Sequence, residues 1–275
     1  MAEIRHSIAV KRRAFLQLHQ TGCFLIPNPW DVGTARYLQS LGFKALATTS
    51  SGFAWTQGRP DNGVTLEQTL EHLRLVAQAV GVPVSADYEA GYAIDAAAVA
   101  ENVALAAKTG VAGLSIEDST GNEAGPLFDF GLAVERVRAA RRAIDGSGTG
   151  VVLTARSEGF LAGRPDLGET VRRLIAYAEA GADCLYAPGI RNPADISRVV
   201  EAVAPKPVNV LVGSDFTTVS ALAALGVRRI SVGGALARAA WGAFLEAAKE
   251  IAEHGTFSGL ARGVPYAEID GRFAS

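Results

Sequence analysis

The sequence predicts an α/β protein with a (β/α)8 TIM-barrel fold, formed as one domain over residues 1–275 with a helical extension at the C-terminus. Eight short apolar runs begin near residues 23, 45, 83, 113, 151, 184, 207 and 229, and segments with helical periodicity separate them. Strands that alternate with helices favour a parallel sheet. Eight such units within about 250 residues match the size of a closed barrel.

A recurring junction supports these units in turn. A glycine stands between a helical segment and the next apolar run at Gly42, Gly81, Gly110, Gly181 and Gly226. Such a glycine provides the left-handed residue that often ends a helix. The predicted strands are, in order, CFLIP, KALATT, PVSAD, GLSIED, VVLTAR, DCLYAP, PVNVLV and RRISVG. An open doubly wound sheet is the alternative, but no G-x-G-x-x-G follows the first strand, which disfavours its dinucleotide-binding form.

Composition excludes several classes of function. The chain has 26 Lys and Arg against 28 Asp and Glu, and a net charge of −2 indicates neither nucleic acid nor an anionic membrane as partner. Neither a membrane span nor the apolar core of a signal peptide is evident. Two cysteines, Cys23 and Cys184, are too few for a disulfide framework or a four-cysteine zinc site. We therefore expect a cytoplasmic enzyme.

Two connections between a strand and the following helix are unusually long. SSGFAWTQGRPDNGVT follows the second predicted strand, and STGNEAGPLFDF follows the fourth. We expect both to be loops at the C-terminal face of the barrel, where enzymes of this fold place their chemistry. Long loops within a compact domain are more often functional than incidental.

Polar residues occur where strand alternation would otherwise build a core. Three predicted strands end in a charged residue that follows a small hydroxyl residue by two positions: Ser85–Asp87, Ser115–Glu117 and Thr154–Arg156. Residues two positions apart in a strand share a face. The polar set can therefore converge at the barrel mouth while the apolar set faces the helices. The alternative is an ordinary network of surface ion pairs.

The carboxylates in this cluster indicate a metal ion. Asp87, Glu89 and Glu117 near one point would repel each other by about 4 kcal/mol per pair at 4 Å and an effective dielectric constant of 20. Arg156 and protonation can offset part of this cost. Oxygen ligands favour Mg²⁺ or Mn²⁺ over zinc. No lysine or histidine falls at the C-terminal end of a predicted strand, which argues against a Schiff-base aldolase and a histidine base.

The segments NPWDVGTARYLQSLGFKALATTSSGFAWTQGRPD, VSADYEAGY, GLSIEDS and LTARSEGF resemble the isocitrate lyase/phosphoenolpyruvate mutase superfamily, in that order and spacing. The resemblance runs from about Phe24 to Glu250. It implies a (β/α)8 barrel that assembles as a homotetramer, with the last helix against a neighbouring subunit. It also implies chemistry at C–C or P–C bonds next to a carboxylate, through Mg²⁺-stabilised enolates of 2-oxo acids.

The resemblance assigns roles to the metal-binding residues. Asp87 matches the carboxylate that binds Mg²⁺ most directly and thereby helps to bind the substrate. Glu89 stands where many members have a second aspartate. Asp61 and Glu117 match carboxylates that hold the water shell of the metal.

The substrate-binding residues are assigned in the same way. Ser51, Gly52 and Phe53 match a turn that grips the substrate carboxylate through a hydroxyl and backbone N–H groups. Arg156 matches an arginine that pairs with substrate oxygens, and Asn209 resembles a substrate-binding asparagine displaced along its strand. Arg156 and Ser51, together with the carboxylate Glu117, are the residues expected to act in catalysis.

The sequence departs from the family pattern in its acid-base groups. Isocitrate and methylisocitrate lyases carry a Lys-Cys-Gly-His loop after the fourth strand, whereas residues 119–130 contain no Cys, His or Lys. Phosphonopyruvate-type members carry a lysine in that loop and a histidine after the sixth strand, where this chain has Ala187-Pro188-Gly189.

The expected function is a Mg²⁺-dependent lyase that cleaves a C–C bond of a small 2-oxo or 2-hydroxy carboxylic acid through a metal-stabilised enolate. A hydrolase or decarboxylase on the same scaffold, and a 2-oxo acid binding protein with little turnover, are the alternatives. A phosphosugar-binding barrel that uses Gly213 and Gly233-Gly234 would leave the carboxylates unexplained. Phe244, Leu245, Ala248 and Ile251 share one helix face, which packs either on a neighbouring subunit or on its own barrel.

Overall fold

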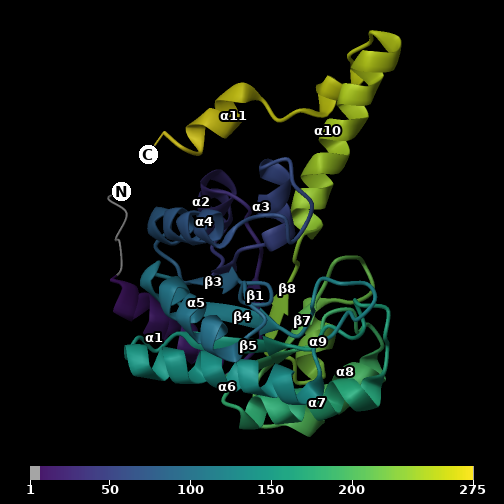
Figure 1. Cartoon of the computed structure of the whole chain (residues 1–275). Helices are drawn as coiled ribbons and strands as arrows, with labels where there is room; N and C mark the ends of the chain where they lie inside the picture. The colour runs from purple at the N-terminus through teal and green to yellow at the C-terminus, as the bar shows by residue number, and fades with distance from the viewer. Residues whose placement is uncertain (1–6, 275) are drawn as a thin grey trace.

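The computed structural model describes residues 7–274 and contains a barrel of eight parallel strands (Figure 1). The strands are β1 (Phe24–Ile26), β2 (Leu46–Ala47), β3 (Val84–Asp87), β4 (Gly113–Glu117), β5 (Val152–Arg156), β6 (Cys184–Tyr186), β7 (Val208–Leu211) and β8 (Arg229–Ser231). Each pairs with its neighbours in the order β1-β8-β7-β6-β5-β4-β3-β2. The Ala47 amide donates to the Pro27 carbonyl at 3.1 Å, which brings the two ends of this order together. The predicted (β/α)8 barrel is confirmed.

Helices alternate with the strands and cover the outside of the barrel (Figure 1). They are α1 (Ile8–Leu18), α2 (Val32–Ser40), α3 (Ser50–Thr56), α4 (Leu66–Ala79), α5 (Ala96–Lys108), α6 (Phe130–Ser147), α7 (Leu167–Glu179), α8 (Pro193–Val203), α9 (Val219–Ala224), α10 (Ala235–His254) and α11 (Tyr266–Gly271), with a 3-10 turn η1 (Ser258–Arg262). No helix within residues 7–274 is long and apolar enough to cross a lipid bilayer.

Most of the predicted helix–strand glycines adopt the left-handed conformation. Gly42, Gly110, Gly181 and Gly226 have φ between 84° and 105°, where a side chain would be strained. Gly81 differs, because α4 already ends at an extended Val80. The expectation of a left-handed cap is therefore wrong at this one junction.

The N-terminal ends of the strands are closed by α1. Phe15 of α1 is fully buried against Phe24, Ile26 and Val152. A Cβ atom at Gly113 would lie 2.5 Å from the Phe15 ring, so glycine is required where this ring enters the barrel. The apolar floor leaves the C-terminal ends of the strands to hold polar residues.

The alternation predicted for β4 and β5 is present. Leu114, Ile116, Leu153 and Ala155 face outwards and pack in the main hydrophobic core with the surrounding helices. At about 25 cal/mol per Å² of apolar surface, such burial is the main stabilising contribution. The intervening polar side chains are thereby directed into the barrel.

The C-terminal helix α10 extends away from the barrel (Figure 1). Ala237 is the single residue of α10 that is buried, and Phe244 and Leu245 are each 58% exposed. Packing of this helix on its own barrel, one of the two alternatives considered from the sequence, is not observed in the described chain. The expected C-terminal helical extension is present as α10, η1 and α11.

Candidate active site

A cavity of about 330 Å³ opens at the C-terminal ends of the strands. Residues from β2 to β8 contribute to its wall, together with segments that follow the strands. The polar side chains of the wall include Thr48, Ser50, Ser51, Asp61, Asp87, Glu89, Glu117, Arg156, Glu158, Tyr186, Arg229 and Ser231. This is the face at which barrel enzymes carry out their chemistry.

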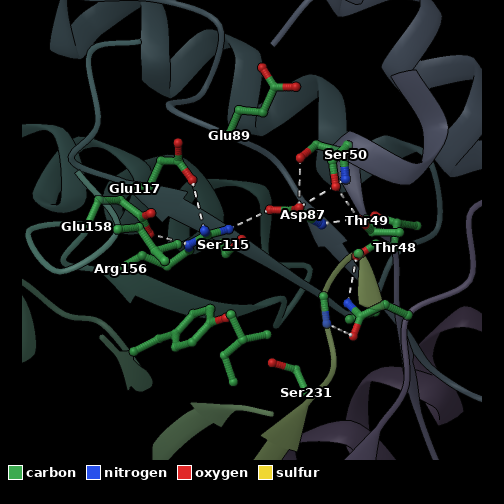
Figure 2. A pocket seen from close by; sticks show the side chains of 18 of the residues that line it. Thr48, Thr49, Ser50, Asp87, Glu89, Ser115, Glu117, Arg156, Glu158 and Ser231 are labelled. Atoms are coloured by element: carbon green, nitrogen blue, oxygen red, sulfur yellow. Dashed lines mark hydrogen bonds and ion pairs between the residues drawn. The ribbon is translucent and has the colours of Figure 1, made fainter. Parts of the chain in front are cut away.

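Arg156 lies at the centre of three carboxylates (Figure 2). Its Nη1 is 2.8 Å from Asp87 Oδ1, its Nη2 is 3.2 Å from Glu117 Oε2, and its Nε is 2.8 Å from Glu158 Oε1. The side chain is 13% exposed. Burial acts to lower the pKa of Arg156, but the three carboxylates outweigh burial and hold the pKa well above the ordinary value. The guanidinium is therefore charged and fixed in one orientation.

Asp87 is held from the other side by the start of α3. Its Oδ2 accepts from the Ser50 amide at 3.0 Å and from the Ser50 hydroxyl at 2.9 Å. The Asp87 amide donates to Thr48 Oγ1 at 3.0 Å. The same Ser50 hydroxyl lies 3.2 Å from Asp61 Oδ1, so Ser50 links two of the predicted carboxylates.

The carboxylates raise the pKa values of one another. Burial is the largest cause for Glu89, whose pKa rises to about 7, with Asp87 and Asp61 adding to the effect. Burial, followed by Asp87, also raises the pKa of Asp61. Burial raises the pKa of Glu117 well above the ordinary value, although Arg156 opposes the shift. This half of the cavity thus brings five carboxyl groups, those of Asp61, Asp87, Glu89, Glu117 and Glu158, to one guanidinium.

Glu89 has an unusual backbone and an unsatisfied side chain. It follows the end of β3 with φ at 48°, a conformation that non-glycine residues rarely adopt. Glu89 is 7% exposed, and its Oε1 has no hydrogen-bond partner among the described residues. Figure 2 shows its carboxylate directed away from the Arg156 cluster. An unsatisfied buried oxygen is costly, which suggests that a cation or water completes it.

The residues at the cavity fit a hard divalent cation. Asp61, Asp87, Glu89 and Glu117 all line it, and all their donor atoms are oxygens, as Mg²⁺ and Mn²⁺ prefer. In their present orientations no three potential ligand residues within residues 7–274 converge as a ready metal site. Asp87 is instead occupied by Arg156 and Ser50.

The segment after β2 corrects part of the sequence interpretation. Residues predicted to form a loop are the helix α3, whose N-cap Thr49 accepts from the Gly52 amide at 3.3 Å. Ser51 lines the cavity, but Gly52 and Phe53 do not. The Phe53 amide bonds to the Thr49 carbonyl within the helix, and the Phe53 ring stacks on His72 at 4.0 Å. Their expected contact with substrate is therefore not supported by their positions.

Asn209 also lies outside the cavity wall. It is 1% exposed, and its Nδ2 donates to Ser231 Oγ at 2.9 Å. Its position supports Ser231 from behind, whereas direct substrate contact was expected. Of the remaining predicted residues, Ser51, Asp61, Asp87, Glu89, Glu117 and Arg156 line the cavity together.

Sequence reasoning missed Glu158, Ser50 and Arg229. Glu158 follows Arg156 by two positions, so the alternation rule would have found it if carried past the strand end. Arg229 precedes Ser231 by two positions in RRIS and points inwards for the same reason. Ser50 had no signal beyond its place next to Ser51.

A buried network supports the Arg156 cluster from outside the cavity. The Glu158 amide donates to Asp118 Oδ1 at 2.7 Å. Asp118 Oδ2 accepts from the Tyr177 hydroxyl at 2.6 Å and from Arg173 at 3.1 Å. These bonds fix the turn after β5 and, through it, the partner of Arg156.

The connection after β4 forms a short hairpin. Ser119 and Leu127 make an antiparallel bridge, and the Thr120 amide donates to the Pro126 carbonyl at 2.9 Å. Ser119 reaches the cavity, whereas Glu123 at the tip is exposed. The segment therefore places no Cys, His or Lys beside the carboxylates.

Known proteins share both the sequence pattern and the fold. The family model described as phosphoenolpyruvate phosphomutase matches residues 15–252. An uncharacterised protein of Mycobacterium tuberculosis is 31% identical over 94% of this chain and 95% of its own length. The 2-methylisocitrate lyase of Escherichia coli is 30% identical over 60% of this chain and 57% of its own length.

Solved structures agree with these matches. A protein of Burkholderia cenocepacia J2315, described as a candidate lyase or mutase, superposes with a TM-score of 0.93 at 48% identity, covering 98% of this chain and 97% of its own. A 2,3-dimethylmalate lyase superposes with a TM-score of 0.84 at 25% identity, covering 98% and 95%. The chain therefore belongs to the phosphoenolpyruvate phosphomutase family, within the isocitrate lyase/phosphoenolpyruvate mutase superfamily.

Proposed function

We propose that the protein is a divalent-cation-dependent lyase that cleaves a C–C bond of a small 2-oxo or 2-hydroxy carboxylic acid. Superfamily members are lyases, mutases and decarboxylases of small acids. The observation that carries the proposal is the cluster at Arg156, where one guanidinium meets three carboxylates beside further acidic residues in one cavity. Such a site is suited to hold a cation and, next to it, an anionic substrate.

Each residue of the cluster has a distinct part. Asp87 would hold Mg²⁺ or Mn²⁺ directly, with Asp61, Glu89 and Glu117 around it. The cation, when bound, would stabilise the negative charge that develops on the substrate oxygen. Arg156 has planar N–H donors that can pair with substrate oxygens and become available once Asp87 turns to the cation. Ser51 offers a hydroxyl to the substrate carboxylate.

Bond cleavage requires that charge is stabilised more strongly in the transition state than in the bound acid. Fixed donors provide this without reorganisation, and Arg156 is fixed by Glu158 and Glu117. Glu89, with a pKa of about 7, can hold a proton on its carboxyl near neutral pH. In the metal-free site Glu89 and Glu117, whose pKa is also raised, are thus the two acids of this half that are suited to proton transfer.

A decarboxylase is the second candidate. The hairpin after β4 offers no Cys, His or Lys. Loss of CO₂ leaves an enolate that solvent water can protonate, so a decarboxylase requires no dedicated acid in this hairpin. Oxaloacetate decarboxylase of Pseudomonas aeruginosa is 28% identical over 71% of this chain. The identity of the reaction products therefore distinguishes a lyase from a decarboxylase.

The test is a panel of 2-oxo and 2-hydroxy acids, incubated with Mg²⁺ or Mn²⁺ and followed by NMR. A C–C lyase releases two organic products, whereas a decarboxylase releases CO₂ and one organic product. Isocitrate and methylisocitrate should be turned over at least about 100-fold more slowly than by a cysteine-bearing homologue, because a positioned acid contributes about 10²–10⁴-fold. Acids that bind without any product would instead favour a binding protein.

We also propose that α10 packs against a neighbouring copy in a homotetramer. Trp241, Phe244, Leu245 and Ile251 are between 37% and 58% exposed on this helix, an apolar surface of the kind that marks interfaces. Light scattering at micromolar concentration should give a tetramer, and Phe244→Asp should dissociate it. A monomeric wild type would contradict this.

The cytoplasmic location stays a prediction from the sequence.

A further inference from the structure

A single row of inward-facing residues crosses five strands of the barrel. Register pairs place Glu117 beside Arg156, Arg156 beside Tyr186, Tyr186 beside Asn209, and Asn209 beside Arg229. Paired residues of parallel strands point to the same side. Arg156 of β5 and Arg229 of β8 therefore face the same interior, and both line the cavity.

Arg229 has very different surroundings from Arg156. It is 4% exposed and makes one side-chain hydrogen bond with a described residue, from Nη1 to Thr154 Oγ1 at 2.8 Å. Its Nε is buried without a partner, and no carboxylate of residues 7–274 forms an ion pair with it. A guanidinium does not lose its charge in proteins. Arg229 is thus a buried cation without a counter-ion beside an open cavity.

The groups in contact with Arg229 supply no negative charge, and Asp87, whose charge favours the guanidinium, forms its ion pair with Arg156. Tyr186 and Ser231 bring hydroxyls to the cavity wall, and burial raises the pKa of Tyr186 to about 12, so its hydroxyl is neutral. Burial and the charge of Arg229 lower the pKa of His19, beneath it, to about 4, so His19 is neutral as well. A buried charge without compensation is costly. An anion that enters the cavity would remove this cost.

We propose that Arg229 is a specificity residue that binds a second acidic group of the substrate. This role rests on the proposed function, which places the oxo-acid or hydroxy-acid end of the substrate at the carboxylate cluster. Tyr186 and Ser231 add hydroxyl donors beside Arg229. An acid that carries a methyl group in place of the second carboxylate leaves the guanidinium uncompensated, which strongly disfavours its binding.

The test compares acids that differ in this one group. Calorimetry with saturating Mg²⁺ measures the affinity for oxalate and for two pairs of acids. Each pair is a diacid and its analogue with a methyl group in place of the second carboxylate: malate with 2-hydroxybutyrate, and the longer 2-hydroxyglutarate with 2-hydroxypentanoate. Wild type should bind the diacid of at least one pair more than about tenfold tighter than its partner, or about 1.4 kcal/mol, since hydrogen bonds to charged groups are stronger than those between neutral groups. Arg229→Met should reduce this ratio to below about threefold while oxalate affinity changes little.

The matched control is Arg136→Met. Arg136 is also buried, at 1% exposure, but it donates to the carbonyls of Ala90, Ala93 and Ile94, away from the cavity. Arg136→Met should be less stable than wild type but should keep the wild-type ratio of diacid affinity to analogue affinity. If Arg229→Met does not fold, Arg229→Lys replaces it, and its ratio should fall at least threefold because an ammonium cannot form a forked pair.

The outcomes separate this proposal from the function on which it rests. Two outcomes overturn the role of Arg229 alone. In the first, wild type binds oxalate but does not prefer the diacids; in the second, the preference for diacids persists in the Arg229 variant. Failure of wild type to bind oxalate or any of the acids overturns the proposed function and this inference together.

Discussion

The two halves of the cavity wall have opposite electrostatic character. In the half formed by β2 to β5, Arg156 meets three carboxylates, and burial and like charge raise the pKa of Glu89 to about 7. In the half formed by β6 to β8, Arg229 has no carboxylate partner among the described residues. The first half lacks positive charge and the second lacks negative charge. A cation bound with an anionic substrate would satisfy both, which is why the two halves are best understood as one site.

Loss of Asp87 should have the largest effect, because Asp87 joins the carboxylate half to both Arg156 and Ser50. Asp87→Ala should reduce turnover and oxalate binding by at least about 1000-fold, which corresponds to about 4 kcal/mol. Asp61→Ala is the comparison, since Asp61 is linked to Asp87 through the Ser50 hydroxyl and would act on the cation through water. We expect a loss of about 10-fold there. Equal losses in steady-state kinetics would show that the two carboxylates are equivalent.

Arg156→Lys should have an intermediate effect. Three nitrogens of Arg156 hold three separate carboxylates, and one ammonium cannot reproduce this planar arrangement. We expect kcat/KM to fall by about 10–100-fold, or about 1.4–2.8 kcal/mol, with circular dichroism unchanged. Arg172→Lys, on the exposed surface of α7, should retain wild-type kinetics. Retention of wild-type kinetics by Arg156→Lys would make Arg156 a purely structural residue.

Glu89→Gln should change how the stability of the protein depends on pH. The folded protein holds the Glu89 proton up to a pKa of about 7, whereas the unfolded chain releases it near 4.5. The folded state therefore binds more protons over this interval, and wild type loses stability as pH rises from about 4.5 to 7.

Glu89→Gln removes this titration. In urea unfolding without metal, the free energy of unfolding of Glu89→Gln minus that of wild type should therefore be about 2–3 kcal/mol larger at pH 8 than at pH 4. Glu123→Gln, at an exposed position, is the control and should parallel wild type. Parallel curves for Glu89→Gln as well would show that Glu89 is charged in the folded state at neutral pH.

The sequence was sufficient to predict the fold because two patterns in it are strong: the short apolar runs of the strands and the helical periodicity of the segments between them. Apolar alternation located all eight strands, and it correctly directed Asp87, Glu117 and Arg156 into the barrel. Alternation ends with the strand, however. Glu89 lies beyond β3 in a left-handed turn, so its direction depends on backbone conformation that a two-residue period does not describe.

The less predictable parts depend on tertiary contacts. The segment SSGFAWT contains a glycine and was expected to be a loop, but Thr49 caps it as a helix and His72 of α4 stacks on Phe53. Asn209 faces inwards as its strand requires, yet it does not line the cavity, and its Nδ2 donates to Ser231 of β8. Such positions follow from neighbouring elements and not from local pattern.

The most direct test of the central claim is the metal dependence of oxalate binding to the wild-type protein. Calorimetry should show oxalate binding with Mg²⁺ or Mn²⁺, none after treatment with EDTA, and full recovery when the cation is restored in excess. This result would establish that the cavity requires a cation in order to bind the anion. Undiminished binding of oxalate in EDTA would contradict the account, because Arg156 and Arg229 would then be sufficient to bind the acid without a metal.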